Sequence, residues 1–354
     1  MMKKTMLGVI VCLLFWTIWV PIFAAQAPVD EKAVADFYRG KTVTILVGHS
    51  AGGGFDTYAR LIGRYLGKYV PGNPNVIVTN MPGAGTMISV NHMYNSGARD
   101  GTLINSFDGG IVTQQLYKTS GVKFDLNKLF YLGAPDSFLY IMAVTKQSGI
   151  TKFDEILGTN PKEVRIGAVP NIGIEHASLL IRNVLGAKVK LVSGYKGTAE
   201  IRMAMKSGEV DSVITDWGSL RVTNSPDFES GEWLIFVQLT EKPIEDLPQK
   251  TVPLIYQYTK DDEQRELFRM GIINPNQYAR PYALPPGVPA ERAEALRLAF
   301  EKALADEKLL AEAKKAKVGI NPLSGDKIRE LIAAGLNMSP KMRDKLRPIL
   351  LPGG

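Results

Sequence analysis

The sequence predicts an α/β protein with two lobes, each built on a mostly parallel sheet that is flanked by helices. From residue 41 onward, short runs of β-branched residues alternate with helix-patterned stretches, which is the rhythm of βαβ units. This alternation pauses and restarts near residue 164, so two separate sheets are expected. The length of 354 residues, with 45% hydrophobic and 22% charged residues, suits roughly two globular domains of about 150 residues each.

The first block begins with a strand at 42–47 (TVTILV), followed by the loop HSAGGG and a helix. One face of that helix is apolar, because its large residues recur at helical spacing: Tyr58, Leu61, Ile62, Tyr65 and Leu66. A second strand is predicted at 75–80, then the loop MPGAGTM and a helix around 88–94. A third strand is expected within 102–107, after the turn residues Arg99-Asp100-Gly101.

The second block repeats this order. A strand at 164–169 precedes the loop PNIG and a helix that ends at Gly186. A strand at 188–193, the loop GYKG, a helix ending at Gly208 and a strand at 210–215 follow. The charged segment beyond Pro289 predicts three further helices, at 291–305, at 306–316 and after a cap at Ser324.

Two apolar strands, at 139–145 and 232–240, stand on either side of the second block. We expect them to link the lobes, with the chain leaving one lobe and later returning to it. The first lobe is therefore assigned to residues 28–145 and 232–354, and the second to residues 146–231. A cleft between the lobes follows from this arrangement.

The first 27 residues have the pattern of a secretory signal peptide. Lys3 and Lys4 precede a long apolar stretch, and Ala25-Gln26-Ala27 matches an A-x-A cleavage site. An uncleaved anchor is the alternative, because about 20 apolar residues can span a bilayer. The only cysteine, Cys12, lies in this segment without lipobox spacing, which excludes a disulfide framework. We expect an exported protein.

Metal and cofactor chemistry have little support in the sequence. The three histidines, His49, His92 and His176, contain no H-x-x-x-H pair. No complete dinucleotide fingerprint or phosphate-binding P-loop occurs. The net charge of +7 fits either a solvated basic surface or a mild preference for small anions. We expect no metal, no cofactor, no nucleic-acid partner and a monomer.

The loop after the first strand has the features of an anion site. Gly52, Gly53 and Gly54 allow backbone amides to approach a ligand with no Cβ in the way, at the positive end of a helix. Asp56 is placed to accept hydrogen bonds from some of these amides, leaving others for the ligand. The alternative is that these glycines only permit a tight turn.

Three other loops lie between a predicted strand and a predicted helix: Pro82-Gly83-Ala84-Gly85, Asn171-Ile172-Gly173 and Tyr195-Lys196-Gly197. Such loops share the carboxyl edge of an open parallel sheet, where ligands bind. Two loops from each lobe would then face each other across the cleft. Asp216, at the end of a strand beside Trp217, is placed to reach it.

A catalytic alternative comes from Gly48-His49-Ser50-Ala51-Gly52, which fits the G-x-S-x-G elbow of α/β-hydrolases. Against it, the elbow would lie on the first strand of the mature chain, with no upstream loop for an oxyanion hole. The bases that could follow Ser50, His92 and His176, both fall on predicted helices instead of a late loop. His176 fits a structural role beside an apolar helix face better than the role of a base.

At these residues the chain resembles the Bug, or TctC-like, family of extracytoplasmic solute-binding receptors of tripartite tricarboxylate transporters. The matching segments span most of the mature chain in the family's order: SAGGGFDTYARLIGRYL, NMPGAGT with ARDGTLI, IGAVPNIGIEHASLL, GYKGTAEIRMAMKSGEVD and LPPGVPAERAEALRLAFEKAL. The resemblance implies a type II periplasmic-binding fold that closes on a carboxylated solute and delivers it to membrane permease subunits. It also implies that backbone amides and ordered water hold the carboxylate.

The candidate ligand-binding residues combine the loop analysis with the resemblance: His49, Ser50, Ala51, Gly52, Gly53, Gly54, Asp56, Pro82, Gly83, Gly85, Asn171, Ile172, Gly173, His176, Tyr195, Lys196, Gly197 and Asp216. Lys196, His49 and Arg280 are the candidates for added positive charge, with a purely structural role as the alternative for Arg280. His49, Thr86 and Ile174-Glu175 depart from the family's usual residues, so the ligand can differ from citrate-like or simple dicarboxylate solutes.

The sequence therefore predicts a receptor without catalysis that binds a small organic anion between two lobes. Two alternatives stay open: a secreted serine hydrolase that uses Ser50, and a sensory or scavenging receptor that serves another membrane protein.

Overall fold

The computed structural model describes residues 30–351. The predicted signal peptide, its cleavage site and Cys12 lie outside these residues. Within 30–351, every helix is too short or too polar to cross a membrane.

The first lobe has a six-stranded sheet in the order β11-β4-β10-β3-β1-β2. β1, β2, β3 and β4 run in one direction, whereas β10 and β11 run in the other. The strands are β1 (Thr42–Val47), β2 (Asn75–Asn80), β3 (Leu103–Ser106), β4 (Phe130–Ala134), β10 (Tyr282–Leu284) and β11 (Leu323–Ser324). The helices of this lobe are α1 (Glu31–Tyr38), α2 (Gly54–Tyr69), α3 (Met87–Ser96), α4 (Ile111–Leu116), α10 (Ala290–Leu304), α11 (Glu307–Lys315) and α12 (Gly325–Leu336).

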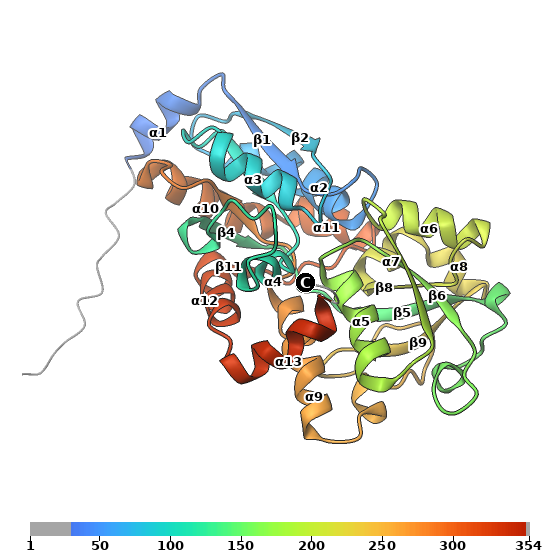
Figure 1. The fold of residues 1–354 in the computed structure, drawn as a ribbon. Coiled ribbons are helices and arrows are strands. Elements are labelled where there is room, and N and C mark those ends of the chain that lie inside the picture. The colour runs from blue at the N-terminus through green and yellow to red at the C-terminus, as the bar shows by residue number, and fades with distance from the viewer. Residues whose placement is uncertain (1–29, 352–354) are drawn as a thin grey trace, which may run out of the picture.

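The second lobe has a five-stranded sheet in the order β7-β6-β8-β5-β9, in which only β5 runs against the others. Its strands are β5 (Tyr140–Thr145), β6 (Val164–Ala168), β7 (Val189–Ser193), β8 (Ser212–Asp216) and β9 (Trp233–Leu239). Its helices are α5 (Gly173–Leu185), α6 (Thr198–Ser207), α7 (Trp217–Thr223), α8 (Ser225–Glu229) and α9 (Asp262–Phe268). Figure 1 shows the two lobes side by side, with α13 (Pro340–Leu350) lying against α5.

The chain crosses between the two sheets twice, in residues 135–139 and in residues 274–281, and α13 later packs on α5 of the second lobe. The two crossing segments meet, because the Phe138 amide donates a hydrogen bond of 2.8 Å to the Asn276 carbonyl. The two strands that we placed at the lobe seam, β5 and β9, pair with each other inside the second sheet. Both strands thus belong to the second lobe, which extends beyond the boundaries predicted at residues 145 and 232. The prediction was wrong here because an apolar strand pattern does not reveal which sheet the strand joins.

The predicted helices agree with the structure where the sequence has both a helical repeat of apolar residues and a capping residue. Gly186 and Gly208 end α5 and α6 in the left-handed conformation, with φ of 71° and 78°. Ser324 begins α12 and accepts a hydrogen bond from the Lys327 amide. The prediction missed β4, β10 and β11, whose short runs lack a distinctive pattern.

A single cluster of buried apolar residues extends through both lobes. It runs from Ile45 in β1 through Phe55, Phe138 and Tyr140 to Ile166 in β6. The lobes are therefore joined by aromatic packing as well as by the two crossing segments.

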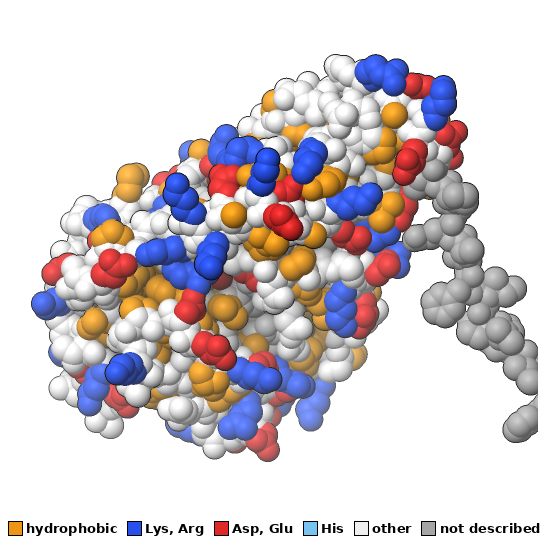
Figure 2. Space-filling model, turned by 180° about the vertical axis from the view of Figure 1, so that it is seen from behind, with side chains coloured by type: hydrophobic (Ala, Val, Ile, Leu, Met, Phe, Trp, Pro, Cys, Tyr) orange, Lys and Arg blue, Asp and Glu red, His pale blue; other side chains and the backbone are white. Residues whose placement is uncertain are grey.

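Charged side chains of both signs cover the surface. Figure 2 shows the face opposite to that of Figure 1, where Lys and Arg side chains are interspersed with Asp and Glu side chains. The net positive charge of the chain is not gathered into one patch on this face, which fits a solvated surface there.

Replacing Ser324 tests the capping argument. In Ser324→Ala the Lys327 amide loses its acceptor at 3.3 Å, so the free energy of unfolding should fall by about 1 kcal/mol. Urea denaturation measures this change. Ser324→Asp keeps a capping acceptor and should stay close to wild type, and an alanine variant as stable as wild type would contradict the assigned cap.

Candidate ligand-binding site

A small cavity lies between the carboxyl edges of the two sheets. Its volume is about 20 Å³, which is room for about one water molecule and not for an organic acid. Both lobes and both crossing segments contribute to its wall: His49, Ser50, Gly53, Gly54, Phe55, Asp108, Phe138, Tyr140, Ile174, Gly197, Thr198, Thr215, Asp216, Ser219 and Arg280.

Three helices of at least ten residues begin at this wall. The seven-residue α7 also begins here, but the Asp216 side chain caps it. Gly53 and Gly54 start α2 from the first lobe, while Ile174 in the first turn of α5 and Gly197 before α6 come from the second. The first amides of a helix have no partner within the helix, and the N-terminal end carries partial positive charge. The cavity therefore lies where the positive ends of three helices converge.

A buried ion pair forms another side of the cavity. The Arg280 Nη2 atom lies 2.6 Å from the Asp216 Oδ2 atom, and both side chains are almost completely buried. Asp216 also accepts hydrogen bonds from the amides of Ser219 and Leu139. Burial disfavours the charged guanidinium, but the nearby Asp216 carboxylate outweighs this and holds the pKa of Arg280 above its ordinary value.

The guanidinium is only partly satisfied by these contacts. Its carbon lies 4.3 Å from the ring centre of Tyr58 and 4.4 Å from that of Phe138, within cation–π range. Among the described residues, its Nε and Nη1 atoms have no hydrogen-bond partner. Arg280 lines the cavity and thus has two buried donor atoms that no carboxylate or carbonyl of residues 30–351 accepts from.

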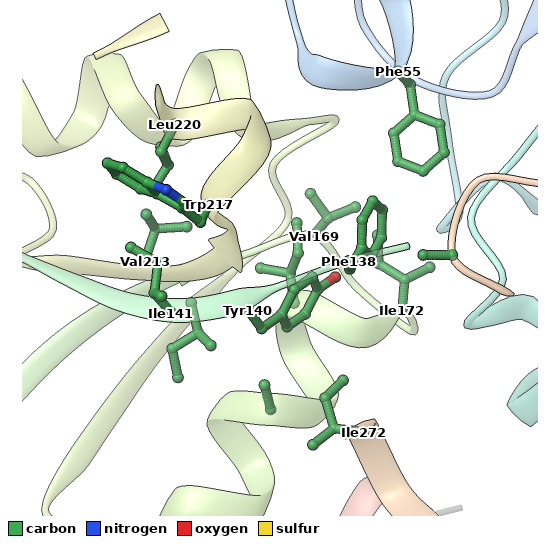
Figure 3. Packing of buried hydrophobic residues seen from close by; sticks show 14 of the residues in the cluster. Phe55, Phe138, Tyr140, Ile141, Val169, Ile172, Val213, Trp217, Leu220 and Ile272 are labelled. Atoms are coloured by element: carbon green, nitrogen blue, oxygen red, sulfur yellow. The ribbon is translucent and has the colours of Figure 1, made fainter. Parts of the chain in front are cut away.

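Aromatic rings connect the lobes around the cavity. His49 stacks on Phe55 at 4.1 Å between ring centres, and Phe55 meets Phe138 edge to face at 5.8 Å. Phe138 stacks in turn on Tyr140 at 5.2 Å. Figure 3 shows the Phe55 ring directed toward Phe138, with Tyr140 beside them. This row of rings, together with Ile174, makes much of the wall apolar.

Two other titratable groups line the cavity in neutral or nearly neutral form. Burial, reinforced by the charge of Arg280, lowers the pKa of His49 to about 3. Burial raises the pKa of Asp108 to about 7, and its Oδ2 atom has no partner among residues 30–351. His49 therefore adds no positive charge near neutral pH, contrary to its place among our candidate cations.

Polar contacts hold the lobes together beside the cavity. The Ser50 hydroxyl donates to the Glu200 carboxylate at 2.9 Å, and Arg202 donates to the Gly52 carbonyl at 3.2 Å. The Gln114 amide group donates to the Asn171 carbonyl at 2.9 Å. Each of these bonds joins the first lobe to the second, so the structure is a closed arrangement.

The structure gathers part of the predicted set at the cavity wall: His49, Ser50, Gly53, Gly54, Gly197 and Asp216. Asp56 lies just behind it and, as expected, accepts a hydrogen bond from a loop amide, that of Gly52. Ala51 and Gly52 are exposed.

The other predicted residues lie away from the wall. Gly85 packs beside the Pro170 carbonyl and Ile172 of the second lobe, and Gly83 faces Ile88 of α3. Pro82, Gly83, Gly85, Asn171 and Ile172 do not line the cavity. Gly173 and His176 are buried in α5, behind Ile174, and the Tyr195 hydroxyl bonds to Glu209. Lys196 is exposed and does not line the cavity. A role for these residues in binding stays a prediction.

Sequence reasoning missed several wall residues: Phe55, Asp108, Phe138, Tyr140, Thr198, Thr215 and Ser219. Ile174, noted only as a departure from the family's usual residues, also lies at the wall. Asp108 follows β3 and precedes α4, so the strand-loop-helix rule that found the other loops could have found it. Phe138 lies on a crossing segment, where no periodic pattern marks it. Arg280, listed only as a candidate cation, lies on the other crossing segment.

The serine-hydrolase geometry does not form. Ser50 donates its hydroxyl hydrogen to Glu200, and none of the hydrogen bonds among residues 30–351 joins Ser50 to a histidine. A hydrolytic serine needs a base that takes its proton, and the triad histidine fills that role. His176 is buried in α5, where desolvation lowers its pKa to about 4.

Solved structures share this architecture. MatC (Rpa3494) from Rhodopseudomonas palustris, with bound malate, has 16% identity and a TM-score of 0.67, with coverage of 86% of this chain and 99% of that chain. R. palustris Rpa4515 with adipate has 19% identity, a TM-score of 0.68 and coverage of 86% and 97%. The periplasmic binding protein BugD has 18% identity, a TM-score of 0.66 and coverage of 88% and 98%.

The chain has the fold of a two-lobed periplasmic binding protein. The resemblance inferred from the sequence motifs is thus confirmed at the level of the fold, with the predicted α/β class and paired sheets. Neither a protein-family model nor a curated protein sequence matches this chain.

Asp108 is expected to make the free energy of unfolding depend on pH. In the unfolded chain its carboxyl ionises near its ordinary value of 3.8, whereas the folded protein keeps the proton up to a pKa of about 7. The folded state therefore binds more protons between these values, and stability falls as the pH rises, by about 1.4 kcal/mol per pH unit for this one group. In Asp108→Asn this loss disappears, so the variant gains on wild type from about pH 4 to about pH 7.

Urea unfolding at a series of pH values measures the difference between the two proteins. The buried His49 and His176 change stability in the opposite direction, but both proteins contain them, so they cancel. The same substitution at exposed Asp262 is the control and should give a smaller, flatter difference. If the Asp108→Asn difference does not widen with pH, Asp108 is ionised in the folded protein.

Proposed function

We propose that this protein is an exported solute-binding receptor that captures a small carboxylate-containing anion between its lobes, without chemical change. The observation that supports this most is the convergence of three helix N-termini and a buried, partly unpartnered guanidinium on one inter-lobe cavity. Such groups stabilise negative charge and supply hydrogen-bond donors to carboxylate oxygens.

Binding requires the lobes to part. A cavity of about 20 Å³ cannot admit even a small organic acid, so the bonds of Ser50, Arg202 and Gln114 across the cleft have to break. The two crossing segments are the only covalent connections between the sheets among residues 30–351, and we assign the hinge to them. Closure would then return the helix ends to the trapped solute.

The proposed partner is a membrane transporter of the tripartite tricarboxylate type, and the proposed location is the periplasm. The N-terminal signal pattern and the fold support both. The structural neighbours MatC and Rpa4515 are described with malate and adipate, which supports a carboxylate ligand for this chain as well. Delivery to a sensor instead of a transporter would use the same binding site.

Gly53→Val tests whether the loop at Gly53 forms part of the ligand-binding cleft. A Cβ at Gly53 has only ordinary contacts, the nearest at 3.5 Å from Thr198 Oγ1, so the variant should fold, but its methyl groups would fill space where the lobes close on a ligand. A thermal-shift screen of mono-, di- and tricarboxylates first finds a ligand that raises the melting temperature. Calorimetry should then show binding to the variant weakened by about 100-fold or more, about 2.8 kcal/mol.

Ala51→Val is the matched control, because Ala51 is in the same loop but exposed and outside the cavity wall. It should bind as wild type does. Equal affinity of Gly53→Val and wild type would remove this loop from the site. If no carboxylate in the screen raises the melting temperature, the proposed function fails.

Ser50→Ala separates the receptor from a hydrolase. We expect neither wild type nor Ser50→Ala to turn over a chromogenic ester, because the Ser50 hydroxyl donates to the Glu200 carboxylate and not to a histidine. Turnover that is lost in Ser50→Ala would contradict the proposed function.

A further inference from the structure

The ion pair with Asp216 leaves some hydrogen-bond donors of Arg280 without an acceptor. A guanidinium carries N–H donors on three nitrogen atoms, and here only Nη2 has an acceptor, the Asp216 carboxylate at 2.6 Å. Nε and Nη1 are buried without partners among residues 30–351, in a side chain that lines the cavity. A buried donor left unpaired is costly, so a ligand oxygen that accepts from it is strongly favoured.

The ionisable side chains at the wall limit the charge that the ligand can carry. Arg280 and Asp216 cancel each other, His49 is neutral near neutral pH, and Asp108 contributes either no charge or a negative one. Net positive charge comes only from the helix ends, each about half an elementary charge. The helix ends can balance the charge of one carboxylate. A second carboxylate would lie without a balancing positive charge in a cavity with room for about one water molecule.

Much of the remaining wall is apolar, although the hydroxyl residues Ser50, Thr198, Thr215 and Ser219 also line it. Phe55, Phe138, Tyr140 and Ile174 line the cavity and are buried, and the rings lie edge to face or stacked. The nearby Arg202 is not part of this wall and already donates to Thr198 and to the Gly52 carbonyl. A second carboxylate on the ligand would face aromatic rings and neutral hydroxyl groups, without a second cationic side chain at the wall.

On the basis of the proposed function, we propose that Arg280 is the anchor of the ligand carboxylate and that the ligand is a monocarboxylate with an apolar body. One carboxylate oxygen accepts hydrogen bonds from the free guanidinium donors, with Asp216 holding the guanidinium in place. The apolar body packs between Phe55 and Phe138. This class is narrower than the carboxylates in general and excludes dicarboxylates as the preferred ligands.

Calorimetry with acids of matched length tests the ligand class. Hexanoate and adipate have the same six-carbon chain and differ by one carboxylate, as do butyrate and succinate; 3-phenylpropionate adds an aromatic body. We expect wild type to bind the best monocarboxylate at least about tenfold more tightly than its dicarboxylate partner, because the second charge is desolvated without compensation.

Variants of the ion pair test the anchor. Arg280→Gln/Asp216→Asn replaces both charges and leaves no unpaired ion in the core, so it should fold, and circular dichroism and the melting temperature check this. We expect it to bind the best monocarboxylate about 100-fold more weakly. Arg280→Lys keeps the charge with other geometry and should retain intermediate affinity. The control Arg165→Gln/Asp211→Asn removes an ion pair of the second lobe that is not at the cavity wall and should bind normally.

The possible failures are distinct. Adipate or succinate binding as tightly as its monocarboxylate partner would overturn the ligand class while keeping the proposed function. Unchanged monocarboxylate binding by a folded Arg280→Gln/Asp216→Asn protein would overturn the anchor. Binding of no acid of either kind would overturn both this inference and the proposed function.

Discussion

The buried pair of Arg280 and Asp216 is the constraint on which the site depends. A buried ion pair costs least when its remaining lone pairs and protons have partners. The Asp216 carboxylate has such partners in the amides of Ser219 and Leu139, whereas the Nε and Nη1 atoms of Arg280 have none among residues 30–351. Arg280 belongs to one crossing segment and Leu139 to the other, while Asp216 ends β8 of the second sheet. The same interaction therefore fixes both crossing segments at the carboxyl edges, where the helix ends meet.

From the sequence, the glycines near this pair were expected to let backbone amides approach a ligand. The structure gives Gly54 a different steric role. A Cβ at Gly54 would lie 2.5 Å from Ser219 Oγ and 3.2 Å from Arg280 Nη2. Gly54 is thus needed for the close approach of α2 to α7 and to the guanidinium. Gly53 and Gly197, whose Cβ atoms would have room, fit better the role of leaving space where the lobes close.

Periodic patterns predicted most of the fold, and strand-loop-helix order predicted part of the site. Strands 42–47 and 75–80 were found at their observed bounds, because β-branched runs between turn signals are distinctive. The crossing segments have no such period, so Phe138 was missed and Arg280 could not be distinguished from a surface arginine. Sequence alone also could not show that burial removes the charge of His49, since burial depends on packing by distant residues.

The unpartnered polar atoms of the closed cavity favour a ligand that supplies hydrogen-bond partners to them. Besides Arg280, the Oδ2 atom of Asp108 and the Nε2 atom of His49 are buried without partners among residues 30–351, and each such group costs about 1–3 kcal/mol. In an open arrangement, water can satisfy all of them. A solute that accepts from the guanidinium removes part of this cost only when the lobes are closed. The binding free energy then favours closure, and a solute that lacks the carboxylate shifts the equilibrium between open and closed forms less.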